Sequence, residues 1–390
     1  MIKTIEIKNY KSIVKLKLDL KRFNVMIGAN GCGKSNILEA IALGAAANAR
    51  MLEKSYLETV IRLANPRLML PAFGELETDR ISICAIEDND MQWSHELHYD
   101  NSQKPARWID DVDLRTQYLM FTLQQKKQNG QTIKVKDLIA VLEELRQDEK
   151  ININQERETS NDHKVLTNRN SIPLSSFKIY SLDEYELRKY TSPGETALGI
   201  HGTGLFSYLK QRAVQPDGKQ FIAEICEGLE SLDWFDGLQI PEDELVGETT
   251  VLIKDKFLAD AFGQFDQRSA NEGFLYLLFY LTLIISDDTP TFFAIDNIDS
   301  AFNPKLCREV IKKLIALAKK HNKQIIATTH NPAVLDGMDL FDEEQNLLVA
   351  QRNTDGYTRL RAVKHDKLDT SLPLSQLWLR GFIGGLPNNF

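Results

Sequence analysis

The sequence lacks any long uninterrupted apolar run. None of its apolar segments approaches the ~18 consecutive residues that a transmembrane helix requires, although 43% of the residues are hydrophobic. The segment after Met1 alternates apolar and polar residues, so it has no apolar core of the kind that a secretion signal carries. We therefore expect a cytoplasmic protein with a large core and no membrane partner.

The chain also has few cysteines, and its acidic residues outnumber its basic ones. The chain has four cysteines, which are Cys32, Cys84, Cys226 and Cys307. Their scatter provides neither zinc-binding spacing nor disulfide density, which is typical of a reducing compartment. The formal net charge of −8 argues against a protein that binds nucleic acid over its whole surface. Lysines recur between Lys3 and Lys21, where they form either the solvated face of a strand or a local track for a DNA or RNA backbone.

Patterns for several other functions are missing. No sustained heptad repeat predicts a long coiled-coil arm, and there is no internal repeat. The sequence shows no carboxylate cluster of the kind that a fused TOPRIM nuclease needs, no histidine–asparagine–histidine nuclease pattern and no zinc spacing. A nuclease activity would therefore belong to a separate protein.

The sequence does contain a phosphate-binding loop. Residues 28–35 read GANGCGKS and fit the spacing G-x-x-x-x-G-K-[ST] of a Walker A motif. An apolar stretch at 23–27 predicts a buried strand before the loop, and helical periodicity at 36–43 predicts a helix after it. The glycines let backbone N–H groups turn toward phosphates, and the helix N-terminus adds partial positive charge. The candidate nucleotide-binding residues are Asn30, Gly31, Cys32, Gly33, Lys34, Ser35 and Asn36.

Two residues of this loop have separate predicted roles. Lys34 reaches the β- and γ-phosphates of ATP, and the Ser35 hydroxyl binds Mg²⁺. ATP and Mg²⁺ are therefore the expected cofactors.

The predicted nucleotide-binding core is split along the chain. Two alternating strands occupy residues 1–20, and strands near 81–86 and 96–99 form an antiparallel pair. From about residue 105 the composition changes to an amphipathic helix at 135–149 and a polar stretch at 151–170. Strong alternation of strand and helix returns only toward the C-terminus. We expect an N-terminal part of the core at 1–104, an inserted, mostly helical lobe at 105–265, and a C-terminal part of the core at 266–390.

Three stretches in the C-terminal part carry further chemistry. The apolar strand 291–296 ends in Asp296, which can hold Mg²⁺ opposite Ser35. The strand 324–330 ends in His330, which can sense or stabilise the γ-phosphate. A polar, glycine-containing turn at 269–273 precedes a predicted helix, and such a helix start is a ready anion site.

The order of these motifs resembles that of the ABC-type ATPases. The order is Walker A, inserted lobe, signature turn, Walker B strand, D-loop at 300–304 and switch histidine. Within that class the chain is similar to the soluble branch that contains SMC, RecF and OLD-family ATPases. The opening (MIKTIEIKNYKSI…FNVMIGANGCGKSNILEAI) and residues 292–335 most resemble the ATPase subunits of bacterial anti-phage modules such as Septu, PARIS and retron systems. The resemblance covers about residues 1–50 and 265–350, and it implies an α/β fold, an ABC-type P-loop ATPase head with a split core.

The resemblance also implies a head-to-tail dimer around ATP. In such a dimer Asn271, Glu272 and Gly273 of one head contact the γ-phosphate held by the other head, with asparagine at a position where the family has serine. The family also carries a glutamate after the Walker B aspartate, where this chain has Asn297, which cannot act as a general base. Asp299 could substitute for it, because residues i and i+2 of an extended strand share a face. We expect Asn297, Asp299 and His330 to organise the water, with slow hydrolysis or ATP serving as a dimer clamp.

The resemblance favours a role as a regulatory subunit. We expect an ATPase that dimerises around ATP and controls a separate effector, a nuclease, in phage defence. A RecF-like repair ATPase that binds DNA directly is the alternative, against which the low net charge counts, and a transporter ATPase ranks last. The tail after Val363 carries apolar and aromatic residues that form either a packed final helix or a docking segment.

Overall fold

The computed structural model describes nine stretches of the chain, which are residues 1–62, 66–72, 78–102, 106–112, 173–189, 197–240, 251–259, 264–368 and 371–386. The predicted helix at 135–149 and the polar stretch at 151–170 lie outside them. The chain divides into two compact units. Unit 1 comprises Met1–Asp19, Glu39–Ser176 and Asn353–Thr358, and unit 2 comprises Leu20–Leu38, Phe177–Arg352 and Arg359–Phe390.

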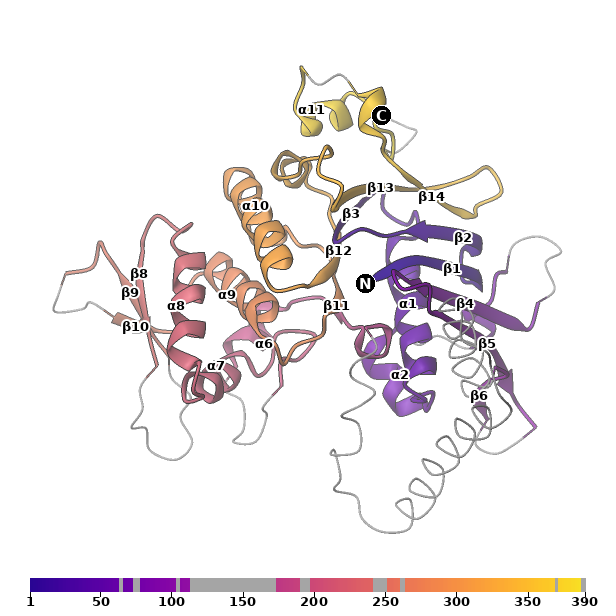
Figure 1. Cartoon of the computed structure of the whole chain (residues 1–390), viewed down its shortest axis with the longest axis horizontal. Helices are drawn as coiled ribbons and strands as arrows, with labels where there is room; N and C mark the ends of the chain where they lie inside the picture. Colours follow the sequence, from indigo (N-terminus) through magenta and orange to yellow (C-terminus); the bar gives the residue numbers. More distant parts are fainter. Residues whose placement is uncertain are drawn as a thin grey trace, which may run out of the picture. The chain divides into compact units, whose positions relative to one another are not determined.

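Unit 1 contains an antiparallel sheet of five strands in the order β2-β1-β4-β5-β6 (Figure 1). Its strands are β1 (Ile2–Tyr10), β2 (Ile13–Asp19), β4 (Arg80–Glu87), β5 (Gln92–Asp100) and β6 (Arg107–Asp110). Alternate residues such as Ile5 and Ile7 are buried, as the period of two predicts. The buried face meets α1 (Lys34–Asn48), because a Cβ added to Gly44 would lie 2.7 Å from Cγ2 of Ile83.

Short helical elements complete the described part of unit 1. They are α2 (Lys54–Val60), α3 (Pro66–Met69) and the 3₁₀ turn η1 (Leu174–Ser176). The N-terminal lysines divide into two groups. Lys3, Lys8, Lys15 and Lys17 are exposed, whereas Lys11 forms an ion pair with the buried carboxylate of Glu39. The exposed lysines therefore face solvent on the strands, which both a solvated strand face and a track for a nucleic-acid backbone require.

Unit 2 is organised around a six-stranded sheet in the order β14-β13-β3-β12-β11-β7. Its strands are β3 (Phe23–Ile27), β7 (Ile179–Tyr180), β11 (Phe292–Ile295), β12 (Gln324–Thr328), β13 (Gln345–Arg352) and β14 (Thr358–Ala362). The pairs β13–β3, β3–β12, β12–β11 and β11–β7 are all parallel. The predicted splitting of the core is confirmed, because β3 from the N-terminal part lies between β13 and β12.

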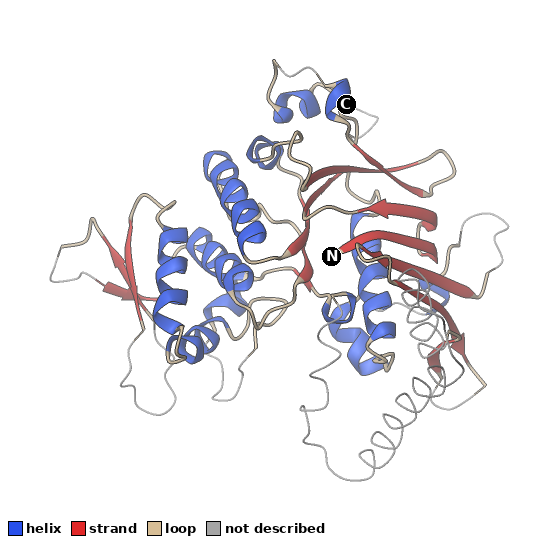
Figure 2. Ribbon diagram, viewed as in Figure 1, coloured by secondary structure: helices blue, strands red, loops and turns tan. Residues whose placement is uncertain are grey.

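Helices and a second sheet complete unit 2. The helical elements are α6 (Glu184–Arg188), α7 (Leu205–Ala213), α8 (Gly218–Leu229), α9 (Glu272–Ile285), α10 (Pro304–Lys320), η3 (Pro332–Gly337), η4 (His365–Lys367) and α11 (Leu374–Leu379). The second sheet has the order β10-β9-β8, with β8 (Phe235–Gln239), β9 (Leu252–Asp255) and β10 (Gln264–Asp266). Helices α8, α9 and α10 lie side by side on one side of the six-stranded sheet (Figure 2).

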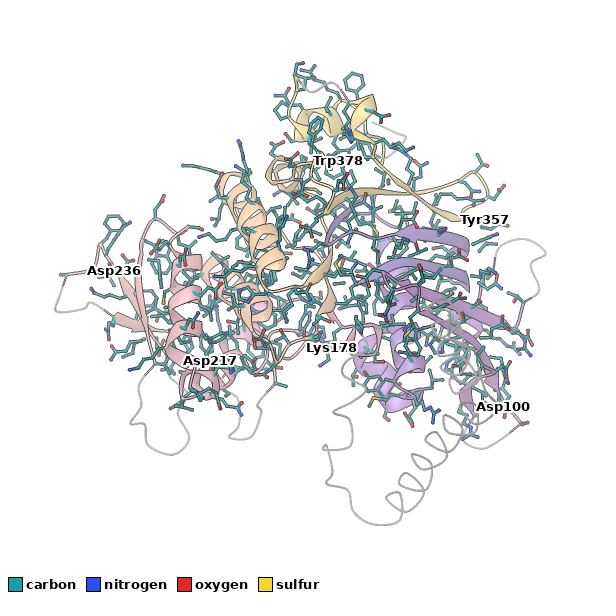
Figure 3. The ribbon with its side chains drawn as sticks, in the orientation of Figure 1. Asp100, Lys178, Asp217, Asp236, Tyr357 and Trp378 are labelled. Atoms are coloured by element: carbon teal, nitrogen blue, oxygen red, sulfur yellow. The ribbon has the colours of Figure 1, made fainter. Side chains whose placement is uncertain are left out.

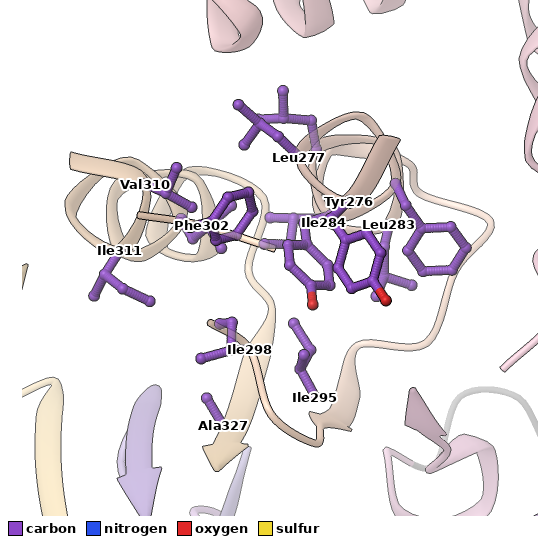
Figure 4. Close-up of a cluster of buried hydrophobic side chains, with 14 of the residues drawn as sticks. Tyr276, Leu277, Leu283, Ile284, Ile295, Ile298, Phe302, Val310, Ile311 and Ala327 are labelled. Carbon is purple, nitrogen blue, oxygen red and sulfur yellow. The ribbon is translucent and has the colours of Figure 1, made fainter. Parts of the chain in front are cut away.

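Helix α9 forms the centre of the hydrophobic core of unit 2. Every residue of α9 from Phe274 to Ile285 is buried. Figure 4 shows Leu283 and Ile284 of this helix beside Ile295, which ends β11, and near Val310 of α10. A helix that is apolar all round must be covered by protein on all sides, and α9 is covered by the sheet and by its two neighbouring helices.

The mixed α/β fold is as predicted, including the N-terminal hairpin, the β4–β5 pair and the helix at 304–320. The predicted strands at 291–296 and 324–330 are present but shorter, because each ends where its last residues turn toward the site described below. In the part of the chain that the structure describes, no helix is both long enough and apolar enough to cross a bilayer.

Candidate nucleotide site

The candidate site lies at the carboxyl edge of the parallel strands of unit 2. The register pairs Ile295 with Ala327, Thr328 with Met26, and Ile27 with Val349, so these strands end at a common level. The loop after β3 and the polar residues after β11 and β12 therefore meet at one edge. Ligands in α/β sheets bind at this edge.

The Walker A loop turns sharply from β3 into α1. Gly28 has a φ of 151°, and a Cβ at this position would lie 2.3 Å from the carbonyl oxygen of Ala350 and 2.8 Å from Sγ of Cys32. Only glycine fits a loop that lies this close to β13. Further along the loop, the guanidinium Nε of Arg352 donates to the carbonyl oxygen of Gly31 at 2.8 Å.

Lys34 is the first residue of α1, and its side chain folds back onto the loop. Its Nζ donates to the carbonyl oxygen of Gly28 at 2.8 Å and to that of Ala29 at 3.4 Å. Burial lowers the pKa of Lys34, and the nearby thiol of Cys32 and carboxylate of Asp296 oppose that shift. The ammonium group thus lies beside the loop and within electrostatic reach of Asp296.

The other predicted loop residues lie where the motif requires. Asn30 and Gly31 are exposed at the tip of the loop, and Cys32 and Gly33 are buried beneath it. Ser35 and Asn36 are half-buried in the first turn of α1, at the helix N-terminus. The N-terminal backbone N–H groups of a helix lack intrahelical partners and can bind an anion.

Asp296 is held at the end of β11 by a threonine of the neighbouring strand. The Thr328 hydroxyl donates to Oδ1 of Asp296 and accepts the backbone N–H of Asn297 at 2.9 Å. One hydroxyl therefore fixes both the Walker B carboxylate and the residue after it.

Asn297 and Asp299 differ in their surroundings. Asn297 is exposed and adopts a left-handed backbone with φ of 54°, and its carbonyl accepts the Ser300 hydroxyl at 2.8 Å. Asp299 is half-buried, and its Oδ1 accepts the Thr329 hydroxyl at 2.5 Å. The Asn297 side chain thus faces solvent next to Asp296, whereas Asp299 is tied to the residue before His330.

His330 follows β12 and is exposed. Its pKa is lowered, first by desolvation and then by the positive charge of Lys34, while Asp299 and Asp296 act in the opposite direction. A neutral imidazole at this position can accept or donate one hydrogen bond. Lys34, Asp296, Asp299 and His330 therefore form one electrostatically coupled group.

The predicted signature turn lies at the start of α9, beside the D-loop. Asn271 caps α9, since its Oδ1 accepts the backbone N–H of Phe274 at 2.8 Å. A Cβ on Gly273 would lie 3.2 Å from the carbonyl oxygen of Ala301. Burial raises the pKa of Glu272, and the nearby Glu184 raises it further. No contact described in the structure joins Asn271, Glu272 or Gly273 to the Walker A loop.

The donor set at the site fits Mg²⁺. Mg²⁺ prefers oxygen ligands and is usually bound through one or two carboxylates together with substrate phosphates and water. The Asp296 carboxylate and the Ser35 hydroxyl provide this limited set. Among the described residues, no group of three or more histidines, cysteines, aspartates or glutamates could hold a metal ion. Mg²⁺ at this site would therefore also need phosphate oxygens and water as ligands.

Sequence reasoning missed three residues that organise this site. Thr328 and Thr329 hold Asp296 and Asp299, and Arg352 holds the Walker A loop. The pair of threonines at the end of a strand next to Walker B was an available signal. No signal in the sequence pointed to Arg352, because its partner Gly31 lies far away in the sequence.

Comparisons with known proteins identify the family of this chain. A family model described as "AAA domain, putative AbiEii toxin, Type IV TA system" matches residues 23–336. No curated protein matches the chain.

Solved structures share the fold at low sequence identity. A crystal structure of an SmcHead bound to the C-winged helix domain of ScpA is 14% identical, covers 94% of this chain and 99% of its own, and has a TM-score of 0.53. The Smc head domain with an extended coiled coil, bound to the C-terminal domain of ScpA derived from Pyrococcus furiosus, is 12% identical and covers 94% of this chain and 97% of its own, with a TM-score of 0.55. The chain therefore has the fold of an SMC head, as predicted.

Proposed function

This chain belongs to the family described as AAA domain, putative AbiEii toxin, Type IV TA system, and we propose that it is an ATP-dependent clamp that controls a separate effector. In this proposal it binds ATP and Mg²⁺, dimerises head to tail around them and hydrolyses ATP slowly. The effector is a nuclease of a phage-defence module.

One observation carries the nucleotide part of the proposal. The parallel strands β3, β11 and β12 end at one edge, where Lys34, Asp296 and His330 are electrostatically coupled. Lys34 exchanges its loop carbonyl partners for the β- and γ-phosphates, and Ser35 and Asp296 hold Mg²⁺. When bound, Mg²⁺ neutralises charge on the phosphate oxygens.

Slow hydrolysis follows from the residue after Asp296. The amide of Asn297 can orient a water but cannot accept its proton. Asp299, which accepts the Thr329 hydroxyl at 2.5 Å, and His330, whose pKa is lowered, are the remaining groups that could organise that water. Neither has the position of a glutamate directly after Walker B.

The proposed dimer uses the start of α9. Asn271, Glu272 and Gly273 bind the γ-phosphate held by a second copy, with backbone N–H groups and the Asn271 amide as donors. Packing of Gly273 on the D-loop residue Ala301 supports a coupling between this contact and the nucleotide site. The effector and its defence role are supported by association alone, through sequence resemblance and the toxin–antitoxin wording of the family description.

Steady-state ATPase activity with Mg²⁺ tests this proposal, measured on the native chain and on Lys34→Ala, Asn297→Glu and Asn297→Gln. We expect native turnover near background, no turnover above background by Lys34→Ala, and a gain of roughly tenfold or more in Asn297→Glu. Asn297→Gln places a side chain of the same length on the left-handed backbone, at the same backbone cost as Asn297→Glu but without a carboxylate, so it should not gain turnover.

The alternatives give distinct results. Brisk native turnover that Lys34→Ala removes would overturn slow hydrolysis and assign the water to Asp299 or His330. A native chain that binds no ATP would overturn the proposal as a whole. Light scattering with and without Mg²⁺ and a slowly hydrolysed ATP analogue tests the clamp, which requires a nucleotide-dependent dimer.

A further inference from the structure

The first glycine of the Walker A loop lies against the C-terminal segment of the chain. A Cβ added to Gly385 would lie 2.8 Å from Cγ1 of Val349, 3.4 Å from Cα of Gly28 and 3.8 Å from its backbone nitrogen. Val349 pairs with Ile27, the residue immediately before Gly28. The backbone at Gly385 therefore touches the point where β3 enters the loop.

This segment is anchored in unit 2 by residues that precede the contact. Ser375 of α11 donates its backbone N–H to Asp336 at 2.9 Å and its hydroxyl to the same carboxylate at 2.7 Å. Trp378, labelled on α11 in Figure 3, and Ile383 are buried. Two residues before Gly385, the carbonyl oxygen of Ile383 accepts from the guanidinium of Arg361 on β14. The segment is thus a fixed part of the fold as far as Gly385.

The approach to Gly28 depends on two consecutive glycines. Gly384 and Gly385 have φ values of 76° and 80°, a left-handed conformation that other residues adopt at a cost. With this turn, backbone instead of a side chain faces the Walker A loop.

We infer that residues 383–386 are a positioning segment for the Walker A loop, with Gly385 as the residue that keeps Gly28 in place for phosphate binding. The inference rests on the proposed nucleotide binding. The carbonyl of Gly28 is also the acceptor that holds Lys34 at 2.8 Å, so a shift of Gly28 moves the lysine as well as the loop N–H groups. Positioning groups of this kind act strongly, because misplacement of about 1 Å can cost up to two orders of magnitude.

The linkage runs in both directions. If an ordered segment favours nucleotide binding, bound nucleotide must favour the ordered segment by the same free energy. Any protein that displaces residues 383–386 would therefore weaken nucleotide binding, which gives a partner of this chain a route to its nucleotide site.

The chain offers a matched pair of glycines for the test. Gly381 has a φ of 81°, nearly the same as Gly385, and a Cβ on Gly381 would meet nothing within 4 Å. Gly381→Ala and Gly385→Ala thus impose the same backbone strain, but only Gly385→Ala forces the segment away from Val349 and Gly28. We would measure the affinity of each variant for a fluorescent ATP analogue with Mg²⁺, together with its melting temperature.

The expected result is roughly tenfold weaker nucleotide binding by Gly385→Ala, and binding within about twofold of native by Gly381→Ala, at similar melting temperatures. Equal affinities of the two variants would overturn the inference. A native chain that binds no nucleotide would instead overturn the proposed function. If Gly385→Ala fails to fold, amide exchange on the native chain decides. Nucleotide must slow exchange at 383–386 in the native chain but not in Lys34→Ala, and unchanged exchange in the native chain would overturn the inference.

Discussion

Two buried lysines lie at opposite ends of the parallel strands of unit 2. The comparison between them distinguishes a structural lysine from a ligand-binding one. Lys34 follows the carboxyl end of β3, and Lys323 precedes the amino end of β12. Their exposed fractions are 7% and 1%, and burial lowers the pKa of both. Residue type and burial are nearly the same, so the difference in role must come from their partners.

Lys323 is fully satisfied by fixed acceptors. Its Nζ donates to the carbonyl oxygen of Ser286 at 2.7 Å, to that of Thr289 at 3.0 Å and to the Thr289 hydroxyl at 2.9 Å. Ser286 is the C-cap of α9, where a cation also interacts favourably with the helix dipole. This lysine therefore fastens the end of α9 to the sheet.

Lys34 has weaker and more local partners. Its nearest acceptors are two carbonyl oxygens of its own loop, at 2.8 and 3.4 Å, and its next contact is the Cys32 sulfur at 4.0 Å. These are partners that an ammonium group can leave for a phosphate. A buried ammonium group is structural where fixed acceptors elsewhere in the fold hold it, and it is available for ligand binding where its partners are longer contacts within its own loop.

The largest expected effect is on stability, at Lys323. Lys323→Met removes the donor shared by the buried carbonyl oxygens of Ser286 and Thr289, so we expect a loss of about 3 kcal/mol in the free energy of unfolding. Urea unfolding measures this loss. Lys312→Met, which removes a half-exposed lysine that contacts Glu309, is the control and should change stability by less than about 1 kcal/mol. Equal effects of the two variants would contradict the structural role of Lys323.

The second effect is on binding, at Lys34. Lys34→Met should weaken binding of ATP and Mg²⁺ by about 100-fold, because it removes the charge that meets the phosphates. The same variant should lower the free energy of unfolding less than Lys323→Met does, since the two carbonyl acceptors that it releases belong to its own loop. Titration calorimetry and urea unfolding on one preparation check both statements. A stability loss as large as that of Lys323→Met would remove the distinction between the two lysines.

The smallest effect is a pH dependence that belongs to Lys323. Burial lowers its pKa to about 8, whereas the unfolded chain has a lysine pKa near ~10.4. Between these values the unfolded chain binds more protons, so stability must rise with pH. Below about pH 8 Lys323 is charged in both the folded and the unfolded chain, so the folded protein carries the full cost of burying the charge.

The measurement is the difference in unfolding free energy between native protein and Lys323→Met at pH 7, 8.5 and 10. We expect this difference to be flat up to about pH 8 and then to shift in favour of the native chain, by at most about 1.4 kcal/mol per pH unit. A difference that stays constant to pH 10 would mean that Lys323 keeps an ordinary pKa in the folded protein.

The sequence by itself determined the elements of the nucleotide core. The Walker A spacing, the apolar strand ending in Asp296 and the strand before His330 are local patterns, since each strand, turn or helix start depends on neighbouring residues. The N-terminal hairpin and the helix at 304–320 were predictable for the same reason.

Only the tertiary structure decided how these pieces are held. The Thr328 hydroxyl on Asp296, Arg352 on Gly31 and Gly385 against Gly28 all join residues that are distant along the chain. Such contacts follow from strand order and register, which bring β3 between β13 and β12. Likewise, Lys34 begins the helix after the β3 loop and Lys323 directly precedes β12. Their different roles appear only when the acceptors around each ammonium group are known.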